Sequence, residues 1–198
     1  PPSGNAVVVT NKSYLEFDGI NTVEKYAFYS DDFGAPKFIR IKNLEIKNVF
    51  SGYGAIVIDD QKGPVGSTNF ECQNLFIHDV NNLDITHGIY LAASNSLVEL
   101  CTIVNVSGRG VSSHNNHRKA SGNVIRKNDI RNCAAGAVLA TMGDNAQIYG
   151  NTLANNGKHG ARVGSSAANV LLQDNRISNS VTDIWIDLGA ANAQVKNN

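Results

Sequence analysis

The stretch Asn151-Thr152-Leu153-Ala154-Asn155-Asn156-Gly157 returns 24 residues further along the chain as Asn175-Arg176-Ile177-Ser178-Asn179, with its Asn and aliphatic positions kept. Outward from these two segments, equivalent residues recur every 23 to 31 positions. The first ladder is Phe17, Ile41, Cys72, Val98, Ile125, Ile148, Leu172 and Val195; the second is Ile20, Leu44, Leu75, Cys101, Asn128, Asn151, Asn175 and Asn198; the third is Thr22, Ile46, Ile77, Ile103, Ile130, Leu153 and Ile177. A period of this length predicts a repeat architecture in which neighbouring units share one core.

Short segments within each repeat alternate between two faces, as in Ile41-Lys42-Asn43-Leu44 and Gly136-Ala137-Val138-Leu139. A period of two indicates strands, and no 3.6-residue stripe indicates helices. Three such strands per repeat, separated by Asn, Gly and Ser corners, predict an all-β parallel solenoid whose coils stack at about 4.8 Å. A leucine-rich repeat has a similar period, but no unit offers its L-x-x-L-x-L-x-x-N pattern with a helical return.

Asn residues fill the second ladder from Asn128 onward. Inward amides can donate and accept along a stack of coils, whereas the alternative reading makes them surface turns. Leu75 and Cys101 hold the same position in earlier coils, which favours an inward site. A second corner position carries Asn48, Asp79, Asn105, Asn132, Asn155 and Asn179.

The two Asn-rich segments, together with His87-Gly88-Ile89-Tyr90-Leu91, resemble the right-handed parallel β-helix family of pectate-lyase-like fold, over roughly residues 13–198. The resemblance implies a single-stranded right-handed parallel β-helix of about seven coils with three short strands each. It also implies an extracellular or cell-surface location. The family includes pectate and alginate lyases, polygalacturonases, uronan epimerases, phage tailspikes and adhesins, so the resemblance does not select one activity.

We expect residues 1–198 to form one domain, with residues 1–12 as an N-terminal edge segment. Asn198 still occupies a ladder position, so either the solenoid is cut within a coil or its open end packs on something else. No signal-peptide pattern is visible at the first residues and no apolar run is long enough for a membrane span.

The charge balance and the cysteine spacing exclude some classes of partner and of metal site. The 17 basic and 17 acidic residues balance, which argues against a nucleic-acid partner. The three cysteines Cys72, Cys101 and Cys133 lack C-x-x-C spacing, and we interpret them as small buried hydrophobes and not as a zinc site or a disulfide framework.

The third strand of each repeat is the predicted working face, because the resemblance makes it the floor of a substrate groove. Its middle residues should point outward: Phe28, Ile56, Tyr90, Ser112, Val138, Arg162 and Trp185. His87 and Arg109 should then lie about 5 Å apart on adjacent coils. The irregular loops at residues 59–64 and 114–119 follow this strand and would wall the groove.

A polysaccharide lyase needs a cation for the uronate carboxylate, a base for the C5 proton and an acid for the leaving oxygen. The candidate catalytic residues are His87, Tyr90, Arg109 and His114; the candidate substrate-binding residues are Ser112, His117, Arg118, Lys119, His159, Arg162 and Trp185. Arg109, Arg162, Arg118 or Lys119 would supply the cation, His87 or His114 the base, and Tyr90 either base or acid. The alternative is that these side chains are merely solvated.

Asp59 and Asp60 are candidate Ca²⁺ ligands, as the resemblance to pectate lyases implies. Paired carboxylates also divide acid and base work in polygalacturonases, and a structural role is the third reading. No other cofactor is predicted.

The sequence therefore leaves two classes of function open. The first is a secreted protein acting on an acidic polysaccharide, by β-elimination in preference to hydrolysis or epimerisation. The second is a noncatalytic glycan-binding or structural solenoid, like a tailspike or adhesin segment. A homo-oligomer would fit the second class if Phe28, Ile56, Val138 and Trp185 formed an apolar seam.

Overall fold

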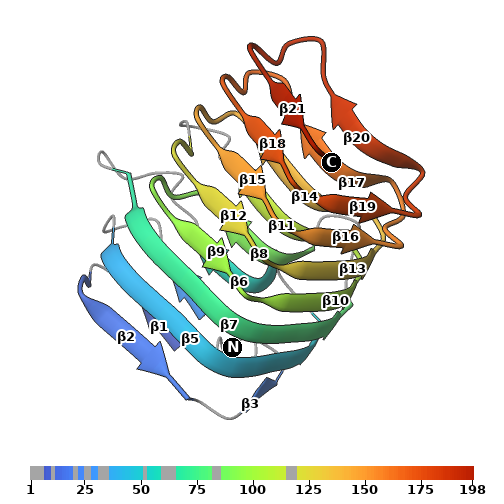
Figure 1. The fold of residues 1–198 in the computed structure, drawn as a ribbon. Coiled ribbons are helices and arrows are strands. Elements are labelled where there is room, and N and C mark those ends of the chain that lie inside the picture. The colour runs from blue at the N-terminus through green and yellow to red at the C-terminus, as the bar shows by residue number, and fades with distance from the viewer. Residues whose placement is uncertain are drawn as a thin grey trace.

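Parallel strands stacked coil upon coil build the part of the chain that the computed structural model describes (Figure 1). That part comprises residues 7–9, 12–19, 22–24, 28–30, 36–50, 53–58, 66–81, 86–114 and 120–198. It contains 21 strands, and none of its residues forms a helix that is long and apolar enough to cross a membrane. The predicted all-β parallel solenoid is confirmed, with a number of coils close to the expected one.

One face of the solenoid is an eight-stranded parallel sheet, to which each coil contributes one strand. In stacking order it comprises β1 (Val7–Val9), β4 (Phe28–Ser30), β6 (Gly54–Ile58), β8 (His87–Leu91), β11 (Arg109–His114), β14 (Gly136–Thr141), β17 (His159–Val163) and β20 (Thr182–Ile186).

The other strands form a 13-stranded sheet that turns a corner. Two long strands, β5 (Lys37–Val49) and β7 (Thr68–Val80), continue through this corner and so belong to the parts of the sheet on either side of it. Figure 1 shows both strands bending there. Shorter strands flank them: β2 (Leu15–Asp18), β3 (Thr22–Glu24), β9 (Leu97–Glu99), β10 (Thr102–Val106), β12 (Val124–Arg126), β13 (Asp129–Cys133), β15 (Gln147–Tyr149), β16 (Thr152–Ala154), β18 (Leu171–Gln173), β19 (Arg176–Ser178) and β21 (Gln194–Lys196).

Strand registers confirm the first ladder throughout, from the pair Phe17 and Ile41 to the pair Leu172 and Val195. The third ladder is confirmed except at its start, where Thr22 is wrong. Thr22 pairs with Glu45 and its neighbour Val23 pairs with Ile46, so the frame of β3 is one residue later than predicted. Ile20 of the second ladder lies outside the described residues.

Left-handed backbone marks the corners where successive strands meet. The second corner position has φ between 55° and 57° at Asn48, Asp79, Asn105, Asn132, Asn155 and Asn179. Asn tolerates this conformation better than other non-Gly residues, which explains its repetition there. The side chains also bond between coils: Asn132 Nδ2 donates to Asn105 Oδ1 at 3.2 Å.

The core is a continuous column of aliphatic side chains enclosed by the sheets. Ile46, Ile77 and Ile103 are fully buried and stack on adjacent coils. The three cysteines are buried and free, as predicted. Since each coil buries its apolar residues against the next, the outward positions remain available for a binding face.

Candidate functional site

The outward row of the eight-stranded sheet differs from the predicted one in three coils. Phe28, Ile56 and Val138 belong to the core column and not to the surface. The register instead aligns Tyr29, Val57, Tyr90, Ser112, Leu139, Arg162 and Trp185. The predicted row is wrong in these coils because it requires Ala55 and Ala137 to point inward. Alanine is small enough to occupy either face, so the sequence does not distinguish the two orientations. The proposed apolar seam therefore keeps one exposed member, Trp185.

The four candidate catalytic residues lie together on β8 and β11. Arg109 is in register with His87, as predicted. The ring of Tyr90 stacks on His87 with centroids 5.3 Å apart and meets the ring of His114 edge-on at 6.1 Å. A second tyrosine, Tyr53, lies 6.4 Å from Tyr90. The stacking of coils therefore brings together residues that are far apart in the sequence, such as Tyr53 and Tyr90, which are 37 positions apart.

Most of this cluster is covered. His87 and Tyr90 are only 5% and 6% exposed, and Tyr90 packs with Val57 in a small apolar cluster apart from the main core. Ser112 lies in register between Tyr90 and Leu139 and is fully buried. Its Oγ has no hydrogen-bond partner among the described residues. The sequence identified these positions but did not predict their burial.

Arg109 is half-buried, and no carboxylate of the described chain forms an ion pair with it. Burial lowers the pKa of its guanidinium, and the charge of Arg162 lowers it further. On the next coil Arg109 is in register with Gly136, which has no side chain. A Cβ at Gly136 would lie 2.8 Å from the carbonyl oxygen of His159, and its φ is 136°. At the equivalent position of the next coil Arg109 therefore has no side chain beside it, and the backbone and Cβ of His159 approach Gly136 there instead.

Beyond Gly136 the cationic character continues. Arg162 Nη2 lies 2.8 Å from Asp187 Oδ2, and the ring of His159 lies 5.5 Å from that of Trp185. Trp185 also donates its indole N–H to Asp187. Sequence reasoning did not assign Asp187 to the site, although its position two residues after Trp185 on the same face was a usable signal.

His87 and His159 are held neutral at neutral pH, because their surroundings lower the pKa of each ring. Burial lowers the pKa of His87 to about 3, with further contributions from Arg109 and His114. The pKa of His159 is also lowered, first by burial and then by Arg162 and Arg109. A group with a pKa near 3 is a weak base at neutral pH, so half-buried His159 suits proton abstraction better than buried His87.

The remaining candidates are not placed. Asp59, Asp60, His117, Arg118 and Lys119 lie outside the described residues. Within the described ranges, no group of three or more His, Cys, Asp or Glu side chains is suited to holding a metal. The Ca²⁺ site stays a prediction.

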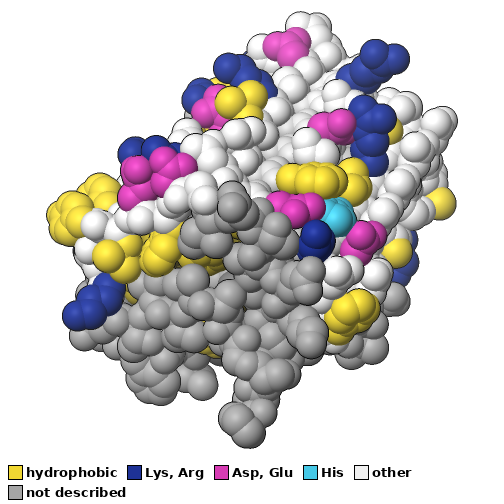
Figure 2. Space-filling model, turned by 90° about the horizontal axis from the view of Figure 1, so that it is seen from below, with side chains coloured by type: hydrophobic (Ala, Val, Ile, Leu, Met, Phe, Trp, Pro, Cys, Tyr) yellow, Lys and Arg dark blue, Asp and Glu magenta, His cyan; other side chains and the backbone are white. Residues whose placement is uncertain are grey.

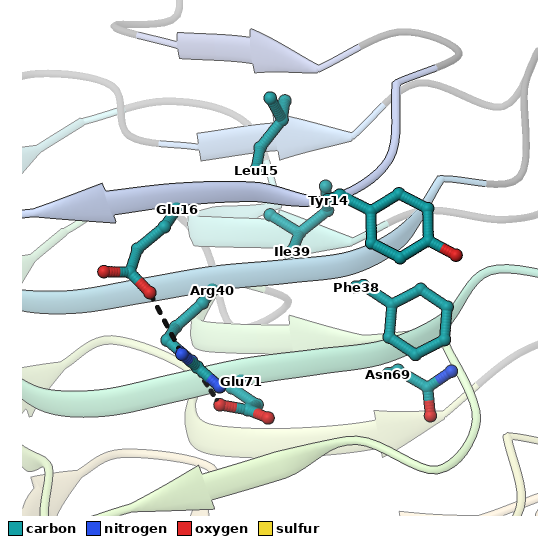
Figure 3. Close-up of a pocket in the computed structure, with 8 residues that line it drawn as sticks. All are labelled: Tyr14, Leu15, Glu16, Phe38, Ile39, Arg40, Asn69 and Glu71. Carbon is teal, nitrogen blue, oxygen red and sulfur yellow. Dashed lines mark hydrogen bonds and ion pairs between the residues drawn. The ribbon is translucent and has the colours of Figure 1, made fainter.

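Two shallow hollows lie elsewhere, on the outer surface of the 13-stranded sheet. One is lined by Tyr14, Leu15, Glu16, Phe38, Ile39, Arg40, Asn69 and Glu71 (Figure 3). The other is lined by Asn43, Leu44, Glu45, Asn74, Leu75, Phe76, Leu100 and Thr102. Neither contains a predicted site residue. Figure 2 shows basic and acidic side chains mixed on the face seen there, without a continuous area of one sign.

Comparison with known proteins supports the fold from an independent direction. A family described as right handed beta helix region matches residues 66–198, about two thirds of the chain. No curated protein gives a match. The chain therefore belongs to the right-handed β-helix family.

Proposed function

We propose that this protein binds an acidic polysaccharide along the outward face of the eight-stranded sheet and cleaves it by β-elimination. The observation that carries the proposal is the half-buried Arg109 without a carboxylate partner among the described residues. A charge that is partly removed from water is costly unless it is paired. A uronate carboxylate would supply the missing counter-charge and can accept two parallel N–H bonds from a guanidinium.

The neighbouring groups suit the remaining steps. With its carboxylate neutralised by Arg109, the uronate would lose its C5 proton to the neutral imidazole of His159. The C4–O bond would then break as the C4–C5 double bond forms, and the leaving oxygen would take a proton from water, because Tyr90 and His114 lie three and two coils away from His159 and would line a neighbouring subsite. His87 would act as a positioning residue, since it stacks on Tyr90 and is in register with Arg109.

The second candidate is a noncatalytic solenoid that binds the same polymer. The low exposure of His87, Tyr90 and Ser112 favours it, because a reaction needs groups that can reach the substrate. On this reading Arg109, Arg162 and half-exposed Trp185 form the binding surface. Either function would place the protein outside the cell, where such polymers occur.

A substrate screen tests the proposal. Pectate, alginate, glycosaminoglycans and bacterial exopolysaccharides would be incubated with the protein, with Ca²⁺ and with chelator, and the ultraviolet absorbance of unsaturated uronates followed. A rise on one polymer that is lost in His159→Gln, with binding retained, is the expected result. Binding without absorbance change or new reducing ends would select the second candidate. Absence of binding to every polymer would overturn both.

A further inference from the structure

An exposed aromatic pair occupies a corner where later coils carry Asn. This corner position has left-handed backbone in eight successive coils, at Tyr14, Phe38, Asn69, Asn95, Gly122, Asn145, Asn169 and Asn192. Asn and Gly tolerate positive φ, whereas a bulky side chain there is an outlier. Tyr14 and Phe38 hold it at 61° and 57°. The two coils that contain Tyr14 and Phe38 thus carry a residue that disfavours this backbone conformation. The later coils carry Asn at the same position, except for one that carries Gly122.

The two rings are not retained for burial. Tyr14 is 78% exposed and Phe38 is 46% exposed. Their rings stack with centroids 4.9 Å apart and planes 11° from parallel. Figure 3 shows them one above the other at the rim of the hollow, with Asn69 of the next coil below Phe38. Backbone strain that is held at an exposed site points to function and not to packing.

Polar side chains line the other side of the same hollow, which has a volume of about 210 Å³. Arg40 lies between two carboxylates: its Nη1 is 3.0 Å from Glu16 Oε2 and its Nε is 2.5 Å from Glu71 Oε2. Lys42 Nζ lies 2.9 Å from the other oxygen of Glu16. The pKa of Glu16 is lowered by the bonds from Lys42 and Arg40, so its carboxylate stays ionised. Both cations are therefore paired with carboxylates.

We propose that the Tyr14 and Phe38 rings and the Glu16–Arg40–Glu71 row form a second carbohydrate site, which takes an uncharged sugar. Flat rings match the apolar face of a pyranose, and the fixed carboxylates and guanidinium present acceptors and donors to its hydroxyl groups. The paired charges offer no free cation to a uronate, in contrast to Arg109 on the other sheet. The protein thus has two faces for two classes of sugar, and this site does not depend on the function proposed above.

The strain at this corner makes the test unusually sharp. Tyr14→Asn and Phe38→Asn introduce the residue that later coils use at this corner. Both variants should therefore keep or raise the melting temperature while they weaken the binding of the sugar. Neutral cello-, xylo-, manno- and galacto-oligosaccharides would be titrated by calorimetry and by saturation-transfer NMR. We expect one series to bind, and its Kd to rise about tenfold or more in each variant. Leu100→Asn is the matched control, because Leu100 is 56% exposed at φ 57° in another corner and does not line this hollow.

Three outcomes would overturn the proposal. The first is the absence of binding by every neutral oligosaccharide. The second is an unchanged Kd in Tyr14→Asn, whose exposed side chain cannot affect the core. The third is a concentration-dependent dimer in sedimentation, lost in Phe38→Asn and accompanied by no sugar binding, which would make the aromatic pair a protein contact. Arg109→Met should leave neutral-sugar binding unchanged, so failure at one face is distinguishable from failure at the other.

Discussion

The side-chain amide of Asn151 donates to Oδ1 of Asn175 at 2.8 Å and to the carbonyl oxygen of Ile125 at 3.0 Å. Its own Oδ1 accepts from both the backbone N–H and the side-chain amide of Asn128 at 3.0 Å. Asn128, Asn151 and Asn175 are all buried. Each inward amide therefore satisfies polar groups of the coils on both sides, which a surface turn would not do.

Replacing Asn151 by Ala should lower the free energy of unfolding by about 2–4 kcal/mol, because several buried donors and acceptors lose their partner at once. Urea unfolding followed by circular dichroism measures the loss. Asn198→Ala is the control, since Asn198 belongs to the same ladder but is exposed, so that water can replace its bonds. Equal losses in the two variants would contradict this account of the ladder.

The repeat allowed the sequence to predict most of this architecture. Period-two segments recur every 23 to 31 residues, and matching their apolar positions predicts the register of Ile41 with Cys72 and of Ile103 with Ile130. The prediction failed where side chains are ambiguous. At Ala137-Val138-Leu139 all three residues are apolar and all three are buried, so alternation could not show which residue faces the core.

The site was predictable only as far as it depends on register. His87 and Arg109 are neighbours because their strands are stacked, and the sequence shows this. The burial of Tyr90, and the lack of a carboxylate partner for Arg109 within the described ranges, depend on packing across coils of unequal length, which no local pattern records. The sequence pattern does not predict the stack of Tyr14 on Phe38, although aromatic residues at a corner that carries Asn or Gly in the later coils are a visible signal.

His78 should give stability a pH dependence at neutral pH. Its ring nitrogens lie 2.9 Å from Glu45 and 2.7 Å from Asp79. Burial opposes protonation, but the bonds to the two carboxylates outweigh it, and the net pKa is raised. A raised folded-state pKa stabilises the fold fully below the unfolded value of about 6.5, and this contribution is lost as pH rises through the folded value. His78→Gln should cost about 0.5–1 kcal/mol at pH 6 and less at pH 9 in urea titrations.

His159 should change the pH dependence of stability, measured by the same urea titrations, in the opposite direction to His78. Its folded-state pKa is lowered, so the protein must exclude a proton there that the unfolded chain accepts. His159→Gln should therefore raise stability at acid pH relative to the parent and have less effect above pH 7.

A parallel pH profile for His78→Gln and the parent protein would contradict the assigned role of Glu45 and Asp79.

The three thiols should be inert in the folded protein. Cys72, Cys101 and Cys133 are buried, and burial raises the pKa of Cys101 and of Cys133 to about 12. Since the thiolate is the reactive form, an aromatic disulfide reagent should label none of them at pH 8 without denaturant and all three in urea. Rapid labelling of one thiol in the native protein would show that its coil opens locally.

Arg109 should be a residue whose removal weakens binding and strengthens the fold. Its half-buried charge has no carboxylate partner in the described chain, so Arg109→Met should raise the free energy of unfolding by about 0.5–1 kcal/mol. The same change should weaken the binding of an acidic polysaccharide by about 10- to 100-fold, since hydrogen bonds to a charged group contribute about 1.5–3 kcal/mol. Arg126→Met is the control: Arg126 lies 2.8 Å from Glu99, so its loss should lower stability and leave binding unchanged. If Arg109→Met destabilised the fold as Arg126→Met does, Arg109 would be a structural residue and the anion site would lose its basis.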